Sequence, residues 1–256
     1  MKAFPALFIS FLLLVSYIKA QNVTYDFYVF ASFWVGTICT LSSCLANQTA
    51  LASPSFFSIH GLWPDYNDGS YPSYCDNSSI FNPAELNAGL KSIMNTHWIG
   101  LSTPTDLFHD HEWSKHGTCW NGPESYKTTA EKMNAYFSTV VNIAFQYNLF
   151  QSLKLFGNVT PSATPYDLSR FNAAFDRLLG PGTYILQCQQ PQNSTDQYLA
   201  YTNICLDLDY KPMPCPAALL NNFPGICPPG DIYYPQLNQT TAEEVSKAEK
   251  TKKIEI

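Results

Sequence analysis

The sequence has few charged residues, and basic residues are the scarcer kind. Only 13% of its 256 residues are charged, and 14 Lys and Arg stand against 20 Asp and Glu, which gives a net charge of −6. Non-specific binding of nucleic acids depends on many phosphate contacts from Lys and Arg, so an acidic chain is a poor general nucleic-acid binder. A polyanionic substrate would therefore have to be held by a local cationic site.

Long apolar runs are missing after the N-terminus. The one such run, Ala3–Ile18, follows Met1-Lys2 and ends at Lys19-Ala20. It is shorter than the roughly 20 residues that a membrane-spanning helix needs, and its charged start and small exit residue are typical of a cleaved secretory signal. We expect residues 1–20 to be a signal peptide rather than a membrane anchor, and we expect no membrane span in the mature chain.

Zinc-ribbon spacing is also absent, because none of the eight cysteines forms a Cys-x-x-Cys pair. An even number of cysteines behind a signal peptide indicates four disulfide bonds made in an oxidising compartment, with roughly a hundred pairings open. Sites for N-linked glycans fit an exported glycoprotein. They begin at Asn22, Asn47, Asn77, Asn158, Asn193 and Asn238.

No internal repeat divides the chain, and we expect one domain over residues 21–240. Residues 241–256 carry four Lys and four Glu with no aromatic residue, and they are interpreted as a charged, solvated tail. Early strands, middle helices and late strands predict an α+β domain with a central antiparallel sheet packed against several helices. Strands are expected at 25–34, 55–59, 183–188 and 197–208, and helices at 82–98, 110–117, 125–155 and 166–179.

The segment Phe108–Trp120 is the richest in reactive side chains and holds three of the five histidines. On a helix that turns about 100° per residue, His111, Glu112, Lys115 and His116 fall within roughly 140° of one another. A carboxylate, a permanent cation and two imidazoles on one face make an acid–base and anion-binding surface. The pattern favours catalysis, although a helix with merely exposed histidines remains an alternative.

A metal site is the competing interpretation of the same segment. The sequence from His111 to His116 is one residue longer than the zinc-protease His-Glu-x-x-His motif, so its imidazoles would lie about 140° apart on the helix instead of about 40°. His109 and His111 could share a metal, but no third ligand is placed convincingly. We expect no metal and no cofactor.

A second segment, Ile59-His60-Gly61-Leu62-Trp63-Pro64, would by itself indicate a turn with a buried histidine. Together the two segments resemble the active-site signatures of the ribonuclease T2 family, Ile-His-Gly-Leu-Trp-Pro and His-Glu-Trp-x-Lys-His-Gly-Thr-Cys. The resemblance extends from about Tyr25 to Tyr234. It implies a secreted or lysosomal/vacuolar endoribonuclease that cleaves single-stranded RNA by transphosphorylation, with an acidic pH optimum and low base specificity.

The resemblance also implies a role for each of five side chains in that reaction. His116 would be the general base on the 2′-hydroxyl, and His60 the general acid on the leaving 5′-oxygen. His111 would bind the phosphate. Glu112 and Lys115 would stabilise the transition state, leaving a 2′,3′-cyclic phosphate that is later hydrolysed to a 3′-phosphate.

Base recognition follows from the same resemblance. Trp63, Asp65 and Tyr71 match positions that bind the base before the cut, although core packing is the alternative for Trp63 and Tyr71. At a second base site the chain departs from its plant relatives, with Phe33 in place of a glutamine and His109 in place of an aromatic residue. We expect weak or altered preference there.

All cysteines fall at family positions, and one implied bond would join the two halves of the site. We expect a monomer that acts on single-stranded RNA and not on DNA. A catalytically silent storage or interaction glycoprotein and a secreted metal-binding glycoprotein are the alternatives. The implied pairs are Cys39–Cys44, Cys75–Cys119, Cys188–Cys227 and Cys205–Cys215.

Overall fold

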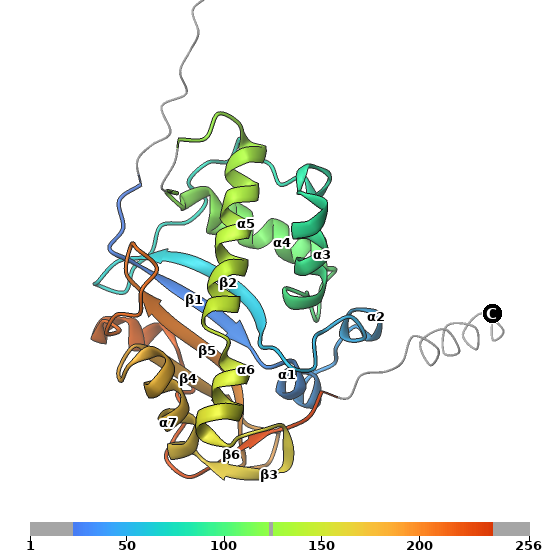
Figure 1. Ribbon diagram of the computed structural model, residues 1–256, viewed down its shortest axis with the longest axis vertical. Coiled ribbons are helices and arrows are strands. Elements are labelled where there is room, and N and C mark those ends of the chain that lie inside the picture. Colours follow the sequence, from blue (N-terminus) through green and yellow to red (C-terminus); the bar gives the residue numbers. More distant parts are fainter. Residues whose placement is uncertain (1–22, 123–124, 238–256) are drawn as a thin grey trace, which may run out of the picture.

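A mixed sheet organises residues 23–122 and 125–237, the part of the chain that this computed structural model describes (Figure 1). Its strands run in the order β2-β1-β5-β6-β3, and β4 pairs with the edge of β5 opposite β1. Every pair is antiparallel except β5 and β6, which are parallel. The strands are β1 (Phe27–Phe33), β2 (Ser58–Asp65), β3 (Ser162–Asp167), β4 (Tyr184–Gln189), β5 (Gln197–Leu206) and β6 (Asp231–Tyr234).

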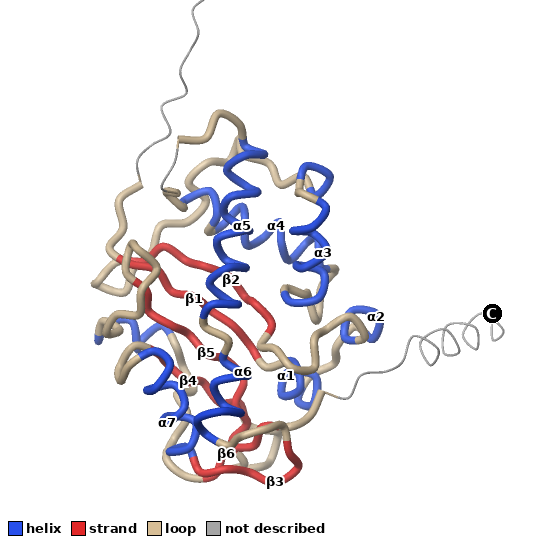
Figure 2. Tube along the Cα trace, viewed as in Figure 1, coloured by secondary structure: helices blue, strands red, loops and turns tan. Residues whose placement is uncertain are grey.

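The helices lie between the early and the late strands in sequence, and α5 crosses β1 and β2 in the view of Figure 2. The capping box of Thr128 and Glu131 fixes the start of α5, because each side chain accepts a hydrogen bond from the backbone of the other. The helices are α1 (Val35–Leu41), α2 (Ala46–Thr49), α3 (Ala88–His97), α4 (Thr105–Lys115), α5 (Thr129–Gln146), α6 (Leu149–Ser152) and α7 (Leu168–Leu179).

The two faces of the sheet are covered differently. One face packs the main core against α5 and α7, with residues such as Leu62, Phe137 and Phe171 fully buried. The other face carries a smaller apolar cluster that includes Val29 and Leu219. Leu219 belongs to the 3-10 turn Ala217–Asn222, so a C-terminal loop covers part of this second face.

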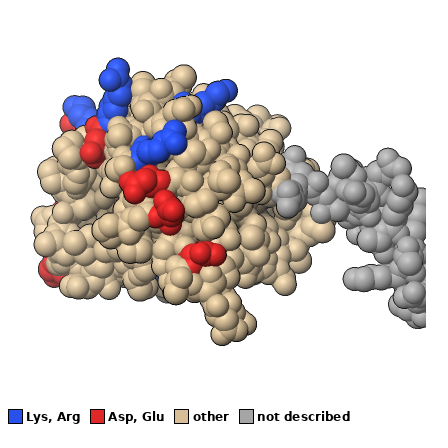
Figure 3. All heavy atoms as spheres, turned by 90° about the horizontal axis from the view of Figure 1, so that it is seen from below, with Lys and Arg blue, Asp and Glu red and all other residues tan. Residues whose placement is uncertain are grey.

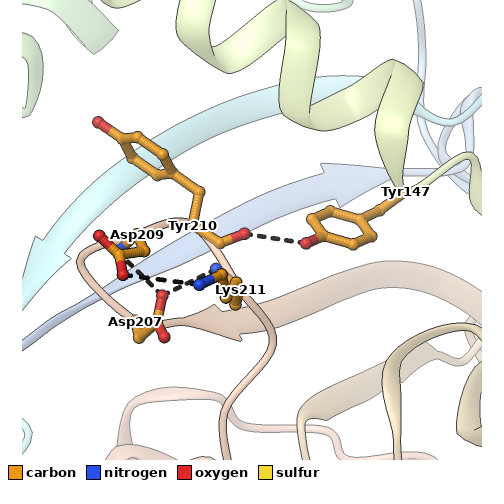
Figure 4. A network of polar contacts seen from close by, with 5 residues as sticks. All are labelled: Tyr147, Asp207, Asp209, Tyr210 and Lys211. Carbon is orange, nitrogen blue, oxygen red and sulfur yellow. Dashed lines mark hydrogen bonds and ion pairs between the residues drawn. The ribbon is translucent and has the colours of Figure 1, made fainter.

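Four disulfide bonds are present, and they are the four pairs that the family resemblance implies. The turn after β5 is held by other means (Figure 4). Asp207 Oδ1 accepts backbone hydrogen bonds from Asp209 and Lys211 at 2.9 and 2.8 Å. Tyr147 Oη, just beyond α5, donates to the carbonyl of Tyr210 at 2.9 Å and so joins the helix layer to this turn.

The α+β prediction is confirmed, but several element boundaries were wrong. The segment 60–64, interpreted as a turn, continues the strand β2. The expected helix 82–98 is interrupted after the 3-10 turn Pro83–Glu85, and α3 begins only at Ala88. Tyr166 belongs to β3, because the Asp167 side chain accepts from the Ser169 backbone and starts α7 there.

The long helix expected over 125–155 also breaks. α5 ends at Gln146, and the Asn148 side chain caps a new short helix by accepting from the Gln151 backbone. Phe145, near the end of α5, is 45% exposed and lies against Phe56. Strands β3 and β6 and helices α1 and α2 were not predicted.

The expected signal peptide and charged tail lie outside the described residues, as do the glycan sites at Asn22 and Asn238. Their boundaries stay predictions. Among the residues that the structure describes, no helix combines the length and the apolar character needed to cross a membrane.

Candidate active site

One cavity of about 270 Å³ brings the two signature segments together. All eight residues predicted to act in catalysis or base binding line it, and two further residues come from the C-terminal loop. The lining residues are His60, Trp63, Asp65, Tyr71, His111, Glu112, Lys115, His116, Asn222 and Phe223.

A bulge in β2 aims His60 into this cavity. Ala31 of β1 pairs with Gly61 and the next residue, Ser32, pairs with Ile59, so His60 is the extra residue of the bulge. In a regular strand, residues three apart point to opposite faces. The bulge removes this alternation, and the rings of His60 and Trp63 lie 5.0 Å apart in an edge-on contact.

Gly61 allows α4 to approach the strand closely enough for Glu112 to reach His60. A Cβ on Gly61 would lie 2.2 Å from Oε2 of Glu112 and 2.5 Å from Nε1 of Trp63. Trp63 Nε1 donates a hydrogen bond to Oε2 of Glu112 at 2.9 Å, and Oε1 lies 3.5 Å from Nε2 of His60. Glu112 is only 1% exposed, so these two partners fix the position of a buried carboxyl group.

Helix α4 presents the remaining functional groups, and the predicted shared face is present. Trp113 is fully buried and fixes the rotation of the helix. His116, directly after the last helical residue, is buried with its ring stacked 5.2 Å from the ring of Trp63. Lys115 places Nζ 5.5 Å from the centre of the Tyr71 ring, which makes Tyr71 part of the cationic side of the cavity.

The loop that carries Tyr71 is attached to the end of α4 by a covalent bond and two hydrogen bonds. Cys75 is bonded to Cys119. The backbone N–H of Tyr74 donates to the Lys115 carbonyl at 3.0 Å, and that of Cys75 donates to Thr118 Oγ1 at 3.1 Å. The two sides of the cavity are therefore held in register.

Burial gives the two central histidines unequal pKa values. It lowers the pKa of His60 to about 4, with help from the nearby charges of His111 and Lys115. It lowers the pKa of His116 further, to about 2, and here Lys115 is the leading charged neighbour, ahead of His60 and His111. Both imidazoles are therefore neutral in the free protein above these values, and His116 is the harder of the two to protonate.

The carboxyl groups of the cavity shift in the opposite direction. Burial raises the pKa of Glu112 to about 8, and the Trp63 hydrogen bond only partly opposes this. Burial likewise raises the pKa of Asp65 to about 7. In mildly acidic solution the carboxyl groups of Glu112 and Asp65 are therefore protonated, while the imidazoles of His60 and His116 are neutral.

A second cavity of about 160 Å³ borders the other side of His60. Phe33, Phe108 and Tyr201 line it together with the loop 99–103. Phe33 gives this wall an aromatic ring. The sequence did not identify Tyr201 or this loop, because nothing in β5 marks one residue as facing His60.

His109 is not a base-site residue, and that interpretation was wrong. It is 1% exposed, lines neither cavity, and lies with Nε2 2.6 Å from the carbonyl oxygen of Trp98. Burial lowers its pKa to about 4. Within residues 23–122 and 125–237, no three His, Cys, Asp or Glu side chains are grouped as metal ligands, and His109 faces away from His111 into the core.

Comparisons with known proteins agree with this geometry. The sequence pattern of the ribonuclease T2 family matches residues 25–215. Extracellular ribonuclease LE of Solanum lycopersicum is 32% identical over 79% of this chain and 86% of its own length. Intracellular ribonuclease LX of the same plant is 32% identical over 76% of this chain and 78% of its own.

A solved structure shares the fold as well. The crystal structure of RNase NT in complex with 5′-AMP superposes with a TM-score of 0.68 at 28% identity, covering 83% of this chain and 99% of that one. The family match spans both signature segments and the β-strands that position them. The chain therefore belongs to the ribonuclease T2 family and is an endoribonuclease of that type.

Proposed function

We propose that the chain cleaves single-stranded RNA by attack of the 2′-hydroxyl on the adjacent phosphate, first to a 2′,3′-cyclic phosphate and then to a 3′-phosphate. One observation carries this proposal. His60 and His116 contact the same Trp63 ring from different elements, with ring-centre distances of 5.0 and 5.2 Å, and both line the cavity that holds Lys115. Two imidazoles on either side of a cationic pocket suit a reaction that removes one proton and delivers another.

His116 is the proposed general base on the 2′-hydroxyl. Its pKa, lowered to about 2, keeps the imidazole neutral and able to accept a proton even in acidic solution. His60 is the proposed general acid on the leaving 5′-oxygen, and it must be protonated to act. Glu112 lies 3.5 Å from its Nε2 and holds the ring in place, while the proton itself comes from the acidic solution.

The substrate itself completes the charge distribution. A phosphate anion in the cavity favours the protonated form of nearby imidazoles and so raises the pKa of His60 above its value in the free protein. Lys115 and His111, which flank the cavity, are placed to hold that phosphate. Together with Glu112 they stabilise the additional negative charge of the transition state.

Local charge, rather than the overall field, supports RNA binding. The chain carries a net charge of −6, and the face shown in Figure 3 is mostly uncharged, with a few basic side chains in its upper part and acidic ones mostly below them. The phosphate must then be recognised mainly at the catalytic cavity. Weak binding along the rest of the strand agrees with the proposed low sequence specificity.

The two cavities suggest where the bases on each side of the cut lie. Trp63, Asp65 and Tyr71 line the His116 side, so the base before the cut belongs there. The leaving nucleoside departs beside His60, and its base belongs in the second cavity with Phe33 and Tyr201. Stacking on such rings tolerates all four bases, which supports weak preference at the second position.

We also propose that the protein is a monomeric glycoprotein that passes through the secretory pathway and acts outside the cell or in an acidic vesicle. Four disulfide bonds support an oxidising route. The asparagines of the four described glycan sites are all exposed. These are Asn47, Asn77, Asn158 and Asn193.

Cleavage of a defined RNA near pH 5 in EDTA tests the proposal. The wild-type protein should cleave it, a DNA of the same sequence should stay intact because it lacks the 2′-hydroxyl, and His60→Ala should leave the RNA intact. A wild type that is inactive on RNA would indicate a silent storage or interaction glycoprotein. Activity that EDTA abolishes would indicate a metal site instead.

A further inference from the structure

Two residues of the catalytic cavity have no role in the chemistry proposed above. Asn222 and Phe223 close the 3-10 turn Ala217–Asn222 and line the cavity beside Trp63 and Asp65. They lie about one hundred and sixty residues after Trp63 in the chain, so the C-terminal loop forms a wall of this cavity. Nothing in the signature segments predicts them.

The loop that carries them is held firmly against the sheet. Cys215 is bonded to Cys205 of β5, and Cys227 is bonded to Cys188 of β4. The backbone N–H groups of Cys215 and Cys227 also donate to carbonyls next to or within β4, at 2.8 and 2.9 Å. Residues 216–226 are therefore anchored at both ends, and their position relative to the cavity is fixed.

The Asn222 side chain has a defined orientation. Its Nδ2 donates to the carbonyl oxygen of Gly69, in the loop between Asp65 and Tyr71. Because a carbonyl can only accept, the amide nitrogen must face Gly69. Among the described residues no group donates to Oδ1, so this oxygen is free to accept a hydrogen bond from a ligand.

Phe223 supplies the apolar part of the wall. It packs against the second apolar cluster of the sheet, which also contacts Trp63. The base that stacks on Trp63 or Tyr71 would thus meet an aromatic side chain at its edge and a carbonyl acceptor next to it. This pairing of apolar surface with one directed polar atom is typical of sites that read a base.

We infer that Asn222 is a specificity-determining residue for the base before the cut, accepting a hydrogen bond from its exocyclic amine, with Phe223 forming the apolar wall beside it. This inference rests on the proposed RNA cleavage. Adenine, cytosine and guanine each carry an exocyclic amine, whereas uracil presents carbonyl oxygens and a single ring N–H. At the position where the other bases carry an exocyclic amine, uracil would place a carbonyl oxygen against the Asn222 oxygen, and its one ring N–H lies between two such carbonyls.

Asp65 does not make Asn222 redundant. Its Oδ1 already accepts from the Tyr66 backbone at 2.9 Å. Burial raises the pKa of Asp65 to about 7, so in acidic solution this carboxyl is protonated and can donate as well as accept. The amide oxygen of Asn222 remains an acceptor at every pH.

The test is the ratio of kcat/KM for ApU to that for UpU near pH 5, with CpU and GpU measured alongside. Asn222→Ala should lower this ratio about 3- to 10-fold, the value of one neutral hydrogen bond, mainly by slowing ApU. Asn222→Gln keeps both the amide donor for the Gly69 carbonyl and an acceptor oxygen, and should retain more of the ratio than Asn222→Ala does. Asn221→Ala, at the exposed neighbour that lines neither cavity, is the matched control and should match the wild type.

The outcomes separate the inference from the proposed function. If Asn222→Ala slows all four dinucleotides equally, or slows none, Asn222 does not read the base and the inference is wrong. If Asn222→Gln, which keeps both the donor and the acceptor, loses the ratio as fully as Asn222→Ala does, the amide oxygen does not read the base and the inference is again wrong. If the wild type cleaves none of the four, the proposed function itself fails.

Discussion

Replacing Glu112 with glutamine should make the protein more stable at neutral pH. Glu112 is 1% exposed, and burial raises its pKa to about 8, whereas the ordinary value is 4.5. A raised pKa means that the folded state favours the protonated form. The favourable contribution is therefore complete below the unfolded pKa and is lost as the pH rises through the folded one.

The size of the effect follows from these two values. Near pH 7 the unfolded chain has released the Glu112 proton, whereas the folded chain retains it. Each pH unit above 4.5 lowers the free energy of unfolding by about 1.4 kcal/mol, so the loss near pH 7 is about 3 kcal/mol. Glutamine resembles the protonated acid, because its oxygen can accept from Trp63 Nε1 and its amide can donate to a neutral His60. Glu112→Gln should thus match the wild type near pH 4 and exceed it by about 3 kcal/mol near pH 7.

Urea unfolding with the disulfides intact, repeated from about pH 4 to 8, measures this difference. Glu85→Gln makes the same chemical change at an exposed position and serves as the control. A gain that does not grow with pH would refute the reasoning. A Glu112→Gln protein that is less stable than the wild type at neutral pH would show instead that Glu112 is ionised and pairs with a protonated His60.

Three further perturbations test other parts of the site. Gly61→Ala places a Cβ 2.2 Å from Glu112 Oε2, so it should lower kcat/KM at least about 100-fold in the folded protein; near-normal turnover would contradict the close approach. Replacing Cys75 and Cys119 together with serine opens a loop of sequence separation 44 and should lower the free energy of unfolding by about 4 kcal/mol in urea titrations; an unchanged midpoint would contradict it. Because His60 must be protonated and its pKa is lowered to about 4, kcat/KM should fall as the pH rises from about 5 to 8; a flat profile would argue against His60 as the acid.

The catalytic face of α4 could be predicted from the sequence because it depends on one local rule. A helix repeats every 3.6 residues, so the spacing from His111 to His116 places four side chains on one face wherever that helix lies. The disulfide pairs and the role of His60 came from the family resemblance. No local pattern near His60 indicates which distant segment it meets.

Other features depend on tertiary contacts that spacing does not encode. The bulge at His60 arises from the pairing of β2 with β1. The sequence of β2 alone does not show this pairing, so this part of the strand was interpreted as a turn. His109 and His111 lie on the same helix, yet the His109 side chain points into the core. There its Nε2 contacts the Trp98 carbonyl and its ring packs against Phe137. Asn222 lies in a loop rich in Pro and Cys, where only the folded chain reveals what it faces.

The most direct test of the central claim follows one phosphodiester through the reaction. ApU is incubated near pH 5 in EDTA with the wild type or with His116→Ala, and the phosphorus products are followed by ³¹P NMR. The proposed mechanism predicts that the wild type forms adenosine 2′,3′-cyclic phosphate before the 3′-phosphate, and that His116→Ala loses at least about 1000-fold in rate. Cleavage at a similar rate by His116→Ala, or a 5′-phosphate as the first product, would contradict it.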